Sequence, residues 1–87
     1  MKILKFTAEW CSSCKAMSKI IEELPDKSFI HEINVESDEG DDLATKFKIK
    51  SLPTIVVLNK NDEEVNRFVG ILSRIHLEDI IQKYGDN

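Results

Sequence analysis

Apolar residues in the chain form short runs typical of buried strands, separated by stripes typical of helices. Residues 2–7 (KILKFT) are apolar on both faces apart from Lys5, which predicts a short buried strand. Residues 28–35 (SFIHEINV) are rich in strand-forming residues and predict a second strand. A third is predicted over residues 54–58 (TIVVL) and opens after Pro53, because the first position of a strand is one of the few that tolerate proline.

The third predicted strand continues into a hairpin. Residues 59–62 have the composition of a turn, and residues 64–69 follow them as a fourth strand. Two strands joined by so short a turn pair antiparallel. The last two strands are therefore expected to lie side by side.

Two helices are predicted in the first half of the chain. The first follows the cysteines, carries one apolar stripe and is stopped by Pro25. Its stripe consists of Met17, Ile20, Ile21 and Leu24, at helical spacing. The acidic stretch 36–42 suits the positive N-terminal end of a second, short helix. That helix is expected to carry Leu43, Ala44 and Phe47.

The last helix has signals at both ends. Ser73 is its expected N-cap, Leu72 and Leu77 are placed for a hydrophobic staple, and Gly85 ends it. Its buried stripe is expected to consist of Leu77, Ile80, Ile81 and Tyr84. The resulting order, β-α-β-α-β-β-α, predicts an α/β fold in which three helices flank one mixed four-stranded sheet. A length of 87 residues suits one domain, residues 1–87.

Composition and charge are those of an ordinary soluble protein and do not favour binding to nucleic acid. The chain is 41% hydrophobic and 32% charged, which is typical of a soluble globular protein. Its net charge of −4 argues against binding to nucleic acid, which needs a clustered basic face. The densest basic stretch, Lys46, Lys48 and Lys50, alternates with Phe47 and Ile49 and predicts a solvated edge.

The chain is also expected to act away from membranes. No apolar run approaches the roughly 20 residues that a membrane-spanning helix needs. Residues 1–10 lack the apolar stretch and cleavage site of a signal peptide. We therefore expect the chain in the cytoplasm, where thiols are kept reduced. A cysteine pair in that compartment calls for a chemical explanation.

The two cysteines lie between the first strand and the first helix, in Trp10-Cys11-Ser12-Ser13-Cys14-Lys15. Unpaired N–H groups at a helix start favour an anion, and the thiolate is the reactive form of cysteine. Cys11, nearer the helix end, is expected to attack a substrate disulfide, and Cys14 is expected to resolve the mixed disulfide. Two intervening residues let the sulfurs meet with little backbone movement.

Three alternatives involve no redox chemistry. A structural zinc site needs four ligands, and the remaining candidates, His31 and His76, lack metal-ligand spacing. We therefore expect no metal. An inert disulfide closing so short a loop would constrain the unfolded chain little. The cysteines could also be two buried thiols without a role, because a strand–CxxC–helix arrangement also arises by chance.

Three segments resemble the thioredoxin family. Phe6-Thr7-Ala8-Glu9-Trp10-Cys11-Ser12-Ser13-Cys14-Lys15 resembles its active-site segment, Leu52-Pro53-Thr54 its cis-proline loop, and Val69-Gly70-Ile71-Leu72-Ser73 its turn before the last helix. The resemblance covers the chain except for the family's extra N-terminal strand and helix. It implies the minimal thioredoxin-like fold that glutaredoxins also use. It also implies an enzyme that reduces protein disulfides with a Cys11–Cys14 dithiol and no bound cofactor.

The resemblance implies roles for further residues. Pro53 is expected to be cis and to face the disulfide, leaving the backbone of Leu52 free to pair with an extended substrate. Trp10, Leu52, Gly70 and Ile71 would form an apolar collar around Cys11. The alternatives are that Trp10 is a partly buried packing residue and that Gly70 is a turn glycine with positive φ.

The sequence departs from the family pattern between the cysteines. Ser12-Ser13 replaces the usual Gly-Pro. Without the proline the helix start is less rigid, and the two hydroxyls could bond to the thiolate. We expect a less reducing couple than is usual in the family.

A second departure lies in the strands. The family usually has a buried aspartate at the position of Lys5 and a lysine at that of Glu32, so the pair looks exchanged. Our hypothesis is a partly buried ion pair beneath Cys14, with Glu32 as the proton acceptor. In the alternative, both side chains extend to solvent at the strand ends.

The resemblance also suggests partners. The expected electron donor is an NADPH-dependent thioredoxin reductase, the clients are disulfide-containing proteins such as ribonucleotide reductase, and the chain is expected to be a monomer. One alternative is a glutaredoxin-like protein reduced by glutathione. That family generally has Gly-Gly before the last helix, whereas here Gly70 is followed by Ile71. The other alternative is a binding subunit that uses the fold as a scaffold.

Overall fold

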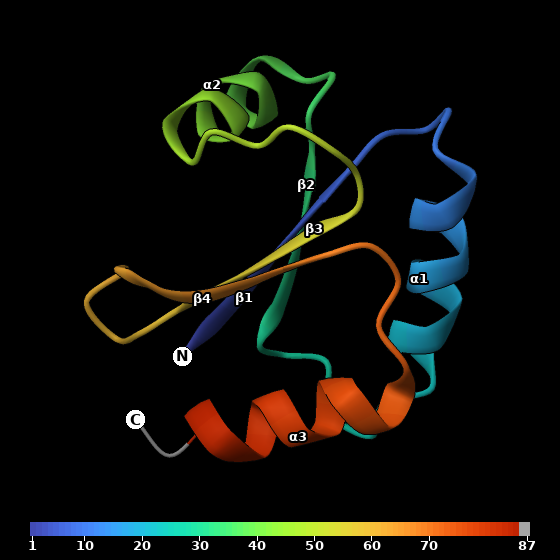
Figure 1. Cartoon of the computed structure of the whole chain (residues 1–87), viewed down its shortest axis with the longest axis vertical. Coiled ribbons are helices and arrows are strands. Elements are labelled where there is room, and N and C mark those ends of the chain that lie inside the picture. Colours follow the sequence, from blue (N-terminus) through green and yellow to red (C-terminus); the bar gives the residue numbers. More distant parts are fainter. Residues whose placement is uncertain (86–87) are drawn as a thin grey trace.

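A computed structural model describes residues 1–85 and contains the predicted order of elements (Figure 1). The four strands are β1 (Lys2–Thr7), β2 (Ile30–Asn34), β3 (Thr54–Leu58) and β4 (Glu64–Val69). The three helices are α1 (Ser12–Glu22), α2 (Asp38–Lys46) and α3 (Arg74–Tyr84). The predicted mixed sheet with three flanking helices is therefore confirmed. None of these helices is long and apolar enough to cross a lipid bilayer.

The strands form one sheet in the order β2-β1-β3-β4. β1 runs parallel to β2, while β3 is antiparallel to both β1 and β4. In this register Lys5, in the middle of β1, lies between Glu32 of β2 and Ile55 of β3. The strand register thus places Lys5 and Glu32 side by side, before any side-chain contact is considered.

The second strand is shorter than the predicted range 28–35. Ahead of it, the carboxylate of Asp26 accepts hydrogen bonds from the N–H and hydroxyl of Ser28, at 2.9 and 2.7 Å, which hold a turn. At its far end the side chain of Asn34 accepts the N–H of Glu36 at 2.9 Å. This Asx-type turn directs the chain into α2. Turns held by local side-chain bonds therefore lie at both ends of the strand.

Helices cover both faces of the sheet. α1 and α3 lie on one face and α2 on the other, as Figure 1 shows. The first face buries Ile3, Ile55 and Val57 against apolar residues of α1 and α3. The second buries Leu4, Phe6, Val56 and Leu58, with Leu43, Ala44 and Phe47 packed against them. Alternate residues of β1 and β3 thus serve opposite cores, which explains why both strands are apolar on both faces.

The predicted helix signals agree with the structure. Ser73 is the N-cap of α3 and its hydroxyl accepts the N–H of His76 at 3.1 Å. Leu72 and Leu77 belong to the same core, as a hydrophobic staple requires. α1 ends at Glu22, and Leu24, beyond its last turn, is still buried.

The start of α2 is seated directly on the end of β2. A Cβ atom on Gly40 would lie 1.7 Å from the carbonyl oxygen of Asn34. Only a residue without a side chain allows this approach. The N-cap Ser37 completes the junction, because its hydroxyl accepts the N–H of Gly40 at 3.0 Å. This junction fixes the position of α2 relative to the sheet.

Candidate active site

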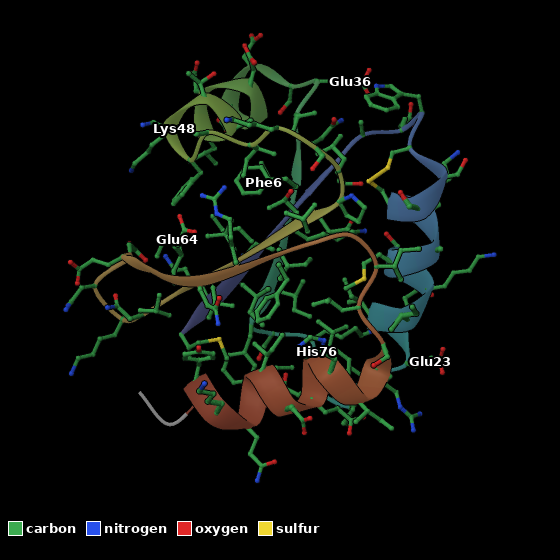
Figure 2. The ribbon with its side chains drawn as sticks, viewed as in Figure 1. Phe6, Glu23, Glu36, Lys48, Glu64 and His76 are labelled. Atoms are coloured by element: carbon green, nitrogen blue, oxygen red, sulfur yellow. A yellow bond between two sulfur atoms is a disulfide. The ribbon has the colours of Figure 1, made fainter. Side chains whose placement is uncertain are left out.

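Cys11 and Cys14 form a disulfide at the start of α1, visible as the yellow sulfur–sulfur bond beside that helix in Figure 2. Cys11 is the N-cap residue, and its Sγ accepts the backbone N–H of Cys14 at 3.2 Å. The Cys11 sulfur thus occupies the place that a serine or aspartate oxygen takes in other helix caps. Cys14 is 1% exposed and Cys11 7% exposed. Cys11 is therefore the more accessible of two largely enclosed residues.

The two serines between the cysteines differ in their contacts. The hydroxyl of Ser13 lies 3.4 Å from Cys11 Sγ and is half-buried. Ser12 is exposed. Of the two hydroxyls considered from the sequence, that of Ser13 is thus the one placed to solvate a thiolate on Cys11.

The loop before β3 lies against the disulfide. The Leu52–Pro53 peptide bond is cis, and Pro53 is buried. The cysteines form a small apolar cluster with Ala8, against which Leu52 packs. The carbonyl of Pro53 accepts the N–H of Gly70 at 2.9 Å, and this bond joins the loop to the turn before α3. Three segments distant in the sequence thus meet at the cysteines.

Three apolar side chains of this region, Trp10, Val69 and Ile71, are exposed, while Leu52 is half-buried. Trp10 is 70% exposed, which contradicts the alternative that it is a packing residue. Ile71 and Val69 are also exposed. Gly70 has φ of +97°, the left-handed conformation that a turn glycine was expected to have. A Cβ at this position would meet no atom within 4 Å, so glycine is favoured there by its backbone conformation and not by lack of space. Val69, at the end of β4 next to Gly70, was not among the predicted site residues, and its exposure adds it to this apolar surface.

The predicted ion pair lies beneath Cys14. Lys5 Nζ lies 2.8 Å from a carboxylate oxygen of Glu32 and donates to the carbonyl oxygen of Cys14 at 2.9 Å. The side chain of Lys5 is 0% exposed, so the alternative in which it extends to solvent is wrong. The side chain of Glu32 is 51% exposed. The pair is therefore buried on the lysine side and open to solvent on the glutamate side.

Ser18 joins this ion pair to the active-site helix. Its hydroxyl accepts a hydrogen bond from Lys5 Nζ and lies 2.9 Å from Glu32 Oε1 and 3.1 Å from the carbonyl oxygen of Cys14. Sequence reasoning did not identify Ser18. Its position four residues after Cys14, on the same side of α1, was the available signal.

The same contacts set the charge of Glu32. The hydrogen bond from Lys5 is the main reason that the pKa of Glu32 lies below its ordinary value. Burial opposes this effect, while the Ser18 hydroxyl and the charge of Lys5 add to it. Glu32 is therefore a carboxylate at neutral pH.

The residues considered for zinc lie on separate elements. His31 is in β2, and His76 is in α3 with its ring edge-on to Phe68 at 5.0 Å. Within residues 1–85 no three or more Cys, His, Asp or Glu side chains are grouped so that they could hold a metal ion. The disulfide in turn contradicts the alternative of two unconnected buried thiols.

The chain is similar to thioredoxins over nearly its whole length. The family model "Thioredoxin" matches residues 1–83. The chain is 33% identical over 88 residues to thioredoxin of Staphylococcus haemolyticus, covering 97% of this chain and 82% of that protein. It is 32% identical over 85 residues to thioredoxin of Buchnera aphidicola, covering 94% and 76%. Among solved structures, thioredoxin-2 of a malaria parasite superposes with a TM-score of 0.79 at 30% identity, covering 93% of this chain and 80% of that one.

Proposed function

Because the chain belongs to the thioredoxin family and is a thiol–disulfide oxidoreductase that reduces protein disulfides, we propose that Cys11 is its nucleophile and Cys14 its resolving residue. The observation that carries this assignment is the hydrogen bond from the Cys14 N–H to Cys11 Sγ at the start of α1. A helix N-terminus stabilises negative charge on the sulfur that it faces. Cys11 is also the more exposed cysteine.

The proposed reaction has two exchanges. The Cys11 thiolate attacks one sulfur of the client disulfide, forming a mixed disulfide and releasing the other client sulfur as a thiolate. Cys14 loses its proton and attacks the Cys11 sulfur, which closes the Cys11–Cys14 disulfide and releases the second client sulfur. The client gains two electrons and two protons, and the protein loses them.

Glu32 is our candidate for receiving the proton of Cys14, with Lys5 holding it in place. Glu32 is an anion at neutral pH, as an ordinary glutamate is, and the lowering of its pKa favours the release of a received proton to solvent. Its exposed side lines a hollow of about 360 Å³ through which a proton can pass to solvent. The other residues of that hollow are Thr7, Ala8, Glu9, Lys15, Ser18 and Asn34. Lys5 would act as a positioning residue, through its bonds to Glu32 and to the Cys14 carbonyl.

The client is proposed to bind beside Cys11 as an extended segment. Trp10, Leu52, Gly70 and Ile71 would form the contact surface, and the backbone of Leu52 would pair with the client. The exposure of Trp10 and Ile71 supports this proposal, because large exposed apolar side chains mark interaction sites. The contact of Leu52 with the cysteine cluster supports the same placement.

We further propose that residues 1–87 work as one monomeric domain in the cytoplasm, without a bound cofactor. Residues 86–87 of that range lie outside the described residues. The proposed electron donor is an NADPH-dependent thioredoxin reductase, and ribonucleotide reductase is a proposed client. The membership of the family supports a reductase partner and disulfide clients in general.

Insulin reduction tests the proposed function and its electron donor. The chain is assayed with NADPH and thioredoxin reductase, and separately with glutathione and glutathione reductase, using Cys11→Ser as the control. Activity with thioredoxin reductase that disappears in Cys11→Ser is the expected result. Activity with glutathione alone would favour the glutaredoxin-like alternative. Equal activity in Cys11→Ser would overturn the role of Cys11.

The potential of the couple is a separate proposal. Ser12-Ser13 and the exchanged Lys5/Glu32 pair are proposed to make the couple less reducing than is usual in the family. Equilibration of the Cys11/Cys14 couple with glutathione measures this directly. A value near that of thioredoxin, about −270 mV, would contradict the proposal. A more oxidising value supports it.

A further inference from the structure

Two surface hollows meet beside the candidate active site. One, of about 260 Å³, is lined by Trp10 and Leu52 together with Lys50 and Ser51. The other, of about 440 Å³, shares Lys50 and Ser51 and reaches Arg67 of β4. Its remaining lining residues are Phe47, Lys48, Thr54, Arg67 and Val69. A client segment on Trp10 and Leu52 could therefore continue along the surface into the second hollow.

The second hollow is lined by cations. Lys48, Lys50 and Arg67 contribute to its walls, and no carboxylate is among its lining residues. The guanidinium of Arg67 is held by Glu64, at 2.6 and 2.8 Å, and donates to the carbonyl of Phe47 at 2.7 Å. Lys48 and Lys50 are exposed. Arg67 therefore shapes the hollow, while the two lysines supply its positive charge.

Lys48 has a left-handed backbone conformation, which is ordinarily found at glycine. It follows α2 with φ of +56°. Its N–H bonds to the carbonyl of Thr45, and the N–H of Ile49 bonds to that of Ala44. This pair of bonds is the helix-ending motif in which glycine is preferred. A lysine in this conformation is less favourable than a glycine, so the cation stands at a position where the backbone alone would favour glycine.

The basic surface is local in an acidic chain. The net charge is −4, and the first turn of α2 carries Asp38, Glu39 and Asp41. Figure 2 labels Lys48 near the opposite end of α2 from Glu36, which precedes the helix. Lys48 and Lys50, two of the three lysines predicted to form a solvated edge, therefore form a positive patch on one side of the active-site surface. A charge pattern of this kind steers partners of opposite charge.

We infer that the hollow at Lys48 and Lys50 is a docking surface for an acidic, extended segment of the client polypeptide, next to the cysteine that Cys11 attacks. This inference deepens the proposed function and rests on it. The apolar contacts at Trp10 and Leu52 hold the client beside Cys11. The two lysines then favour clients with aspartate or glutamate in the flanking residues. The effect acts mainly on the association rate, because the charges are exposed at the rim of the surface.

The test uses synthetic peptides that contain one intramolecular disulfide and no tryptophan. The flank beside the attacked cysteine carries three glutamates in one peptide, three lysines in the second and three glutamines in the third. Reduced protein is mixed with excess peptide, and the fluorescence of Trp10, the single tryptophan of the chain, reports its oxidation. The oxidation forms the Cys11–Cys14 disulfide and converts the peptide disulfide to two thiols. The compared quantity is the second-order rate constant of each peptide.

The matched variants carry the same change of net charge. Lys48→Glu combined with Lys50→Glu reverses the patch. Lys60→Glu combined with Lys83→Glu reverses two lysines that line other hollows, beside Tyr84. We expect the parent and the control variant to react about ten times faster with the acidic than with the basic peptide at low salt. The patch variant should lose or invert this ratio, and added salt should bring every ratio towards one.

A third variant separates charge from folding. Lys48→Gly removes one cation and relieves the left-handed backbone, so it should be at least as stable as the parent and still lose part of the preference for the acidic peptide. Equal rates for acidic and basic peptides in the parent would overturn the inference. A ratio that the patch and control variants lower equally would also overturn it. Failure of every peptide to oxidise the protein would instead contradict the proposed function.

Discussion

The ammonium group of Lys5 donates a hydrogen bond to the backbone carbonyl of Cys14 at 2.9 Å, from a side chain with no exposed surface. A buried cation therefore contacts the backbone of the inner active-site cysteine. Its counter-ion, Glu32, reaches solvent through the hollow beside α1. The ion pair thus lies directly beside the backbone of Cys14.

Removing either partner of this ion pair is expected to cost stability, and removing both is expected to cost less than the sum. Glu32→Gln leaves the buried ammonium without an anion and should lower the free energy of unfolding by about 1–2 kcal/mol, because Glu32 is half exposed. Lys5→Met removes the buried charge itself. In Lys5→Met/Glu32→Gln no charge remains unpaired. Urea unfolding of the four proteins measures this coupling.

The same four proteins test the proton acceptor. The rate at which Cys14 resolves a preformed mixed disulfide at Cys11 should fall in Glu32→Gln while attack by Cys11 stays unchanged. A merely structural role would not separate these two steps. Equal resolution rates in all four proteins would rule out Glu32 as the acceptor.

Stability at acid pH should depend on Glu32. Its pKa is lower in the folded chain than the unfolded value of about 4.3. As the pH falls, the unfolded chain therefore binds a proton at Glu32 before the folded chain does. The stabilisation by ionised Glu32 is complete above the pKa of the unfolded state, and it is lost as the pH falls through the pKa of the folded state. Glu32→Gln should remove part of the acid-induced loss seen by urea unfolding below about pH 4.3.

Glu64 provides the matched control for this pH effect. The hydrogen bond from Arg67 lowers its pKa in the same way, away from the cysteines. Glu64→Gln should also reduce the loss of unfolding free energy at acid pH, but it should leave the rate of resolution by Cys14 unchanged. If Glu32→Gln loses as much unfolding free energy at acid pH as the parent does, the assigned ion pair is contradicted.

Ser13 is expected to activate Cys11. Its hydroxyl lies 3.4 Å from Cys11 Sγ, and a hydrogen bond to a charged group contributes about 1.5 kcal/mol. In Ser13→Ala the alkylation of reduced Cys11 by iodoacetamide at neutral pH should slow by up to about tenfold. Ser12→Ala, which changes an exposed hydroxyl, should leave this rate unchanged. An equal loss of rate in both variants would remove this role from Ser13.

Gly40 should be intolerant of any side chain. A Cβ would lie 1.7 Å from the carbonyl oxygen of Asn34, so α2 would have to move away from β2. Gly40→Ala is therefore expected to lose about 2–3 kcal/mol in urea unfolding. Gly70→Ala is the informative comparison, because it meets no atom and acts only through its positive φ. A stability of Gly40→Ala equal to that of the parent would contradict the close packing of α2 on β2.

Much of the fold and the centre of the site could be predicted from local patterns. The runs in β1 and β3 and the cap at Ser73 are local signals, and the place of Cys11 at a helix start followed from them. The ion pair of Lys5 and Glu32 was expected from a departure from the family pattern, and the strand register brings it about.

Features that depend on tertiary contacts could not be predicted. In the sequence Gly40 is one residue of an acidic stretch, and only the folded structure shows that it packs against the carbonyl of Asn34. Ser18 is an ordinary helix residue until Lys5 and Glu32 meet its hydroxyl. The hollow at Lys48 and Lys50 forms only when the loop before β3 and the end of β4 lie side by side. Each of these features joins segments that are far apart in the sequence.

Trapping of the mixed disulfide tests the central claim most directly. Reduced Cys14→Ser is incubated with a disulfide-containing protein, and the products are separated without reductant and digested for mass spectrometry. The proposed roles predict a stable mixed disulfide linked through Cys11, and none in Cys11→Ser. A mixed disulfide that forms at Cys14 in Cys11→Ser, with none at Cys11 in Cys14→Ser, would contradict the assignment of Cys11 as the nucleophile.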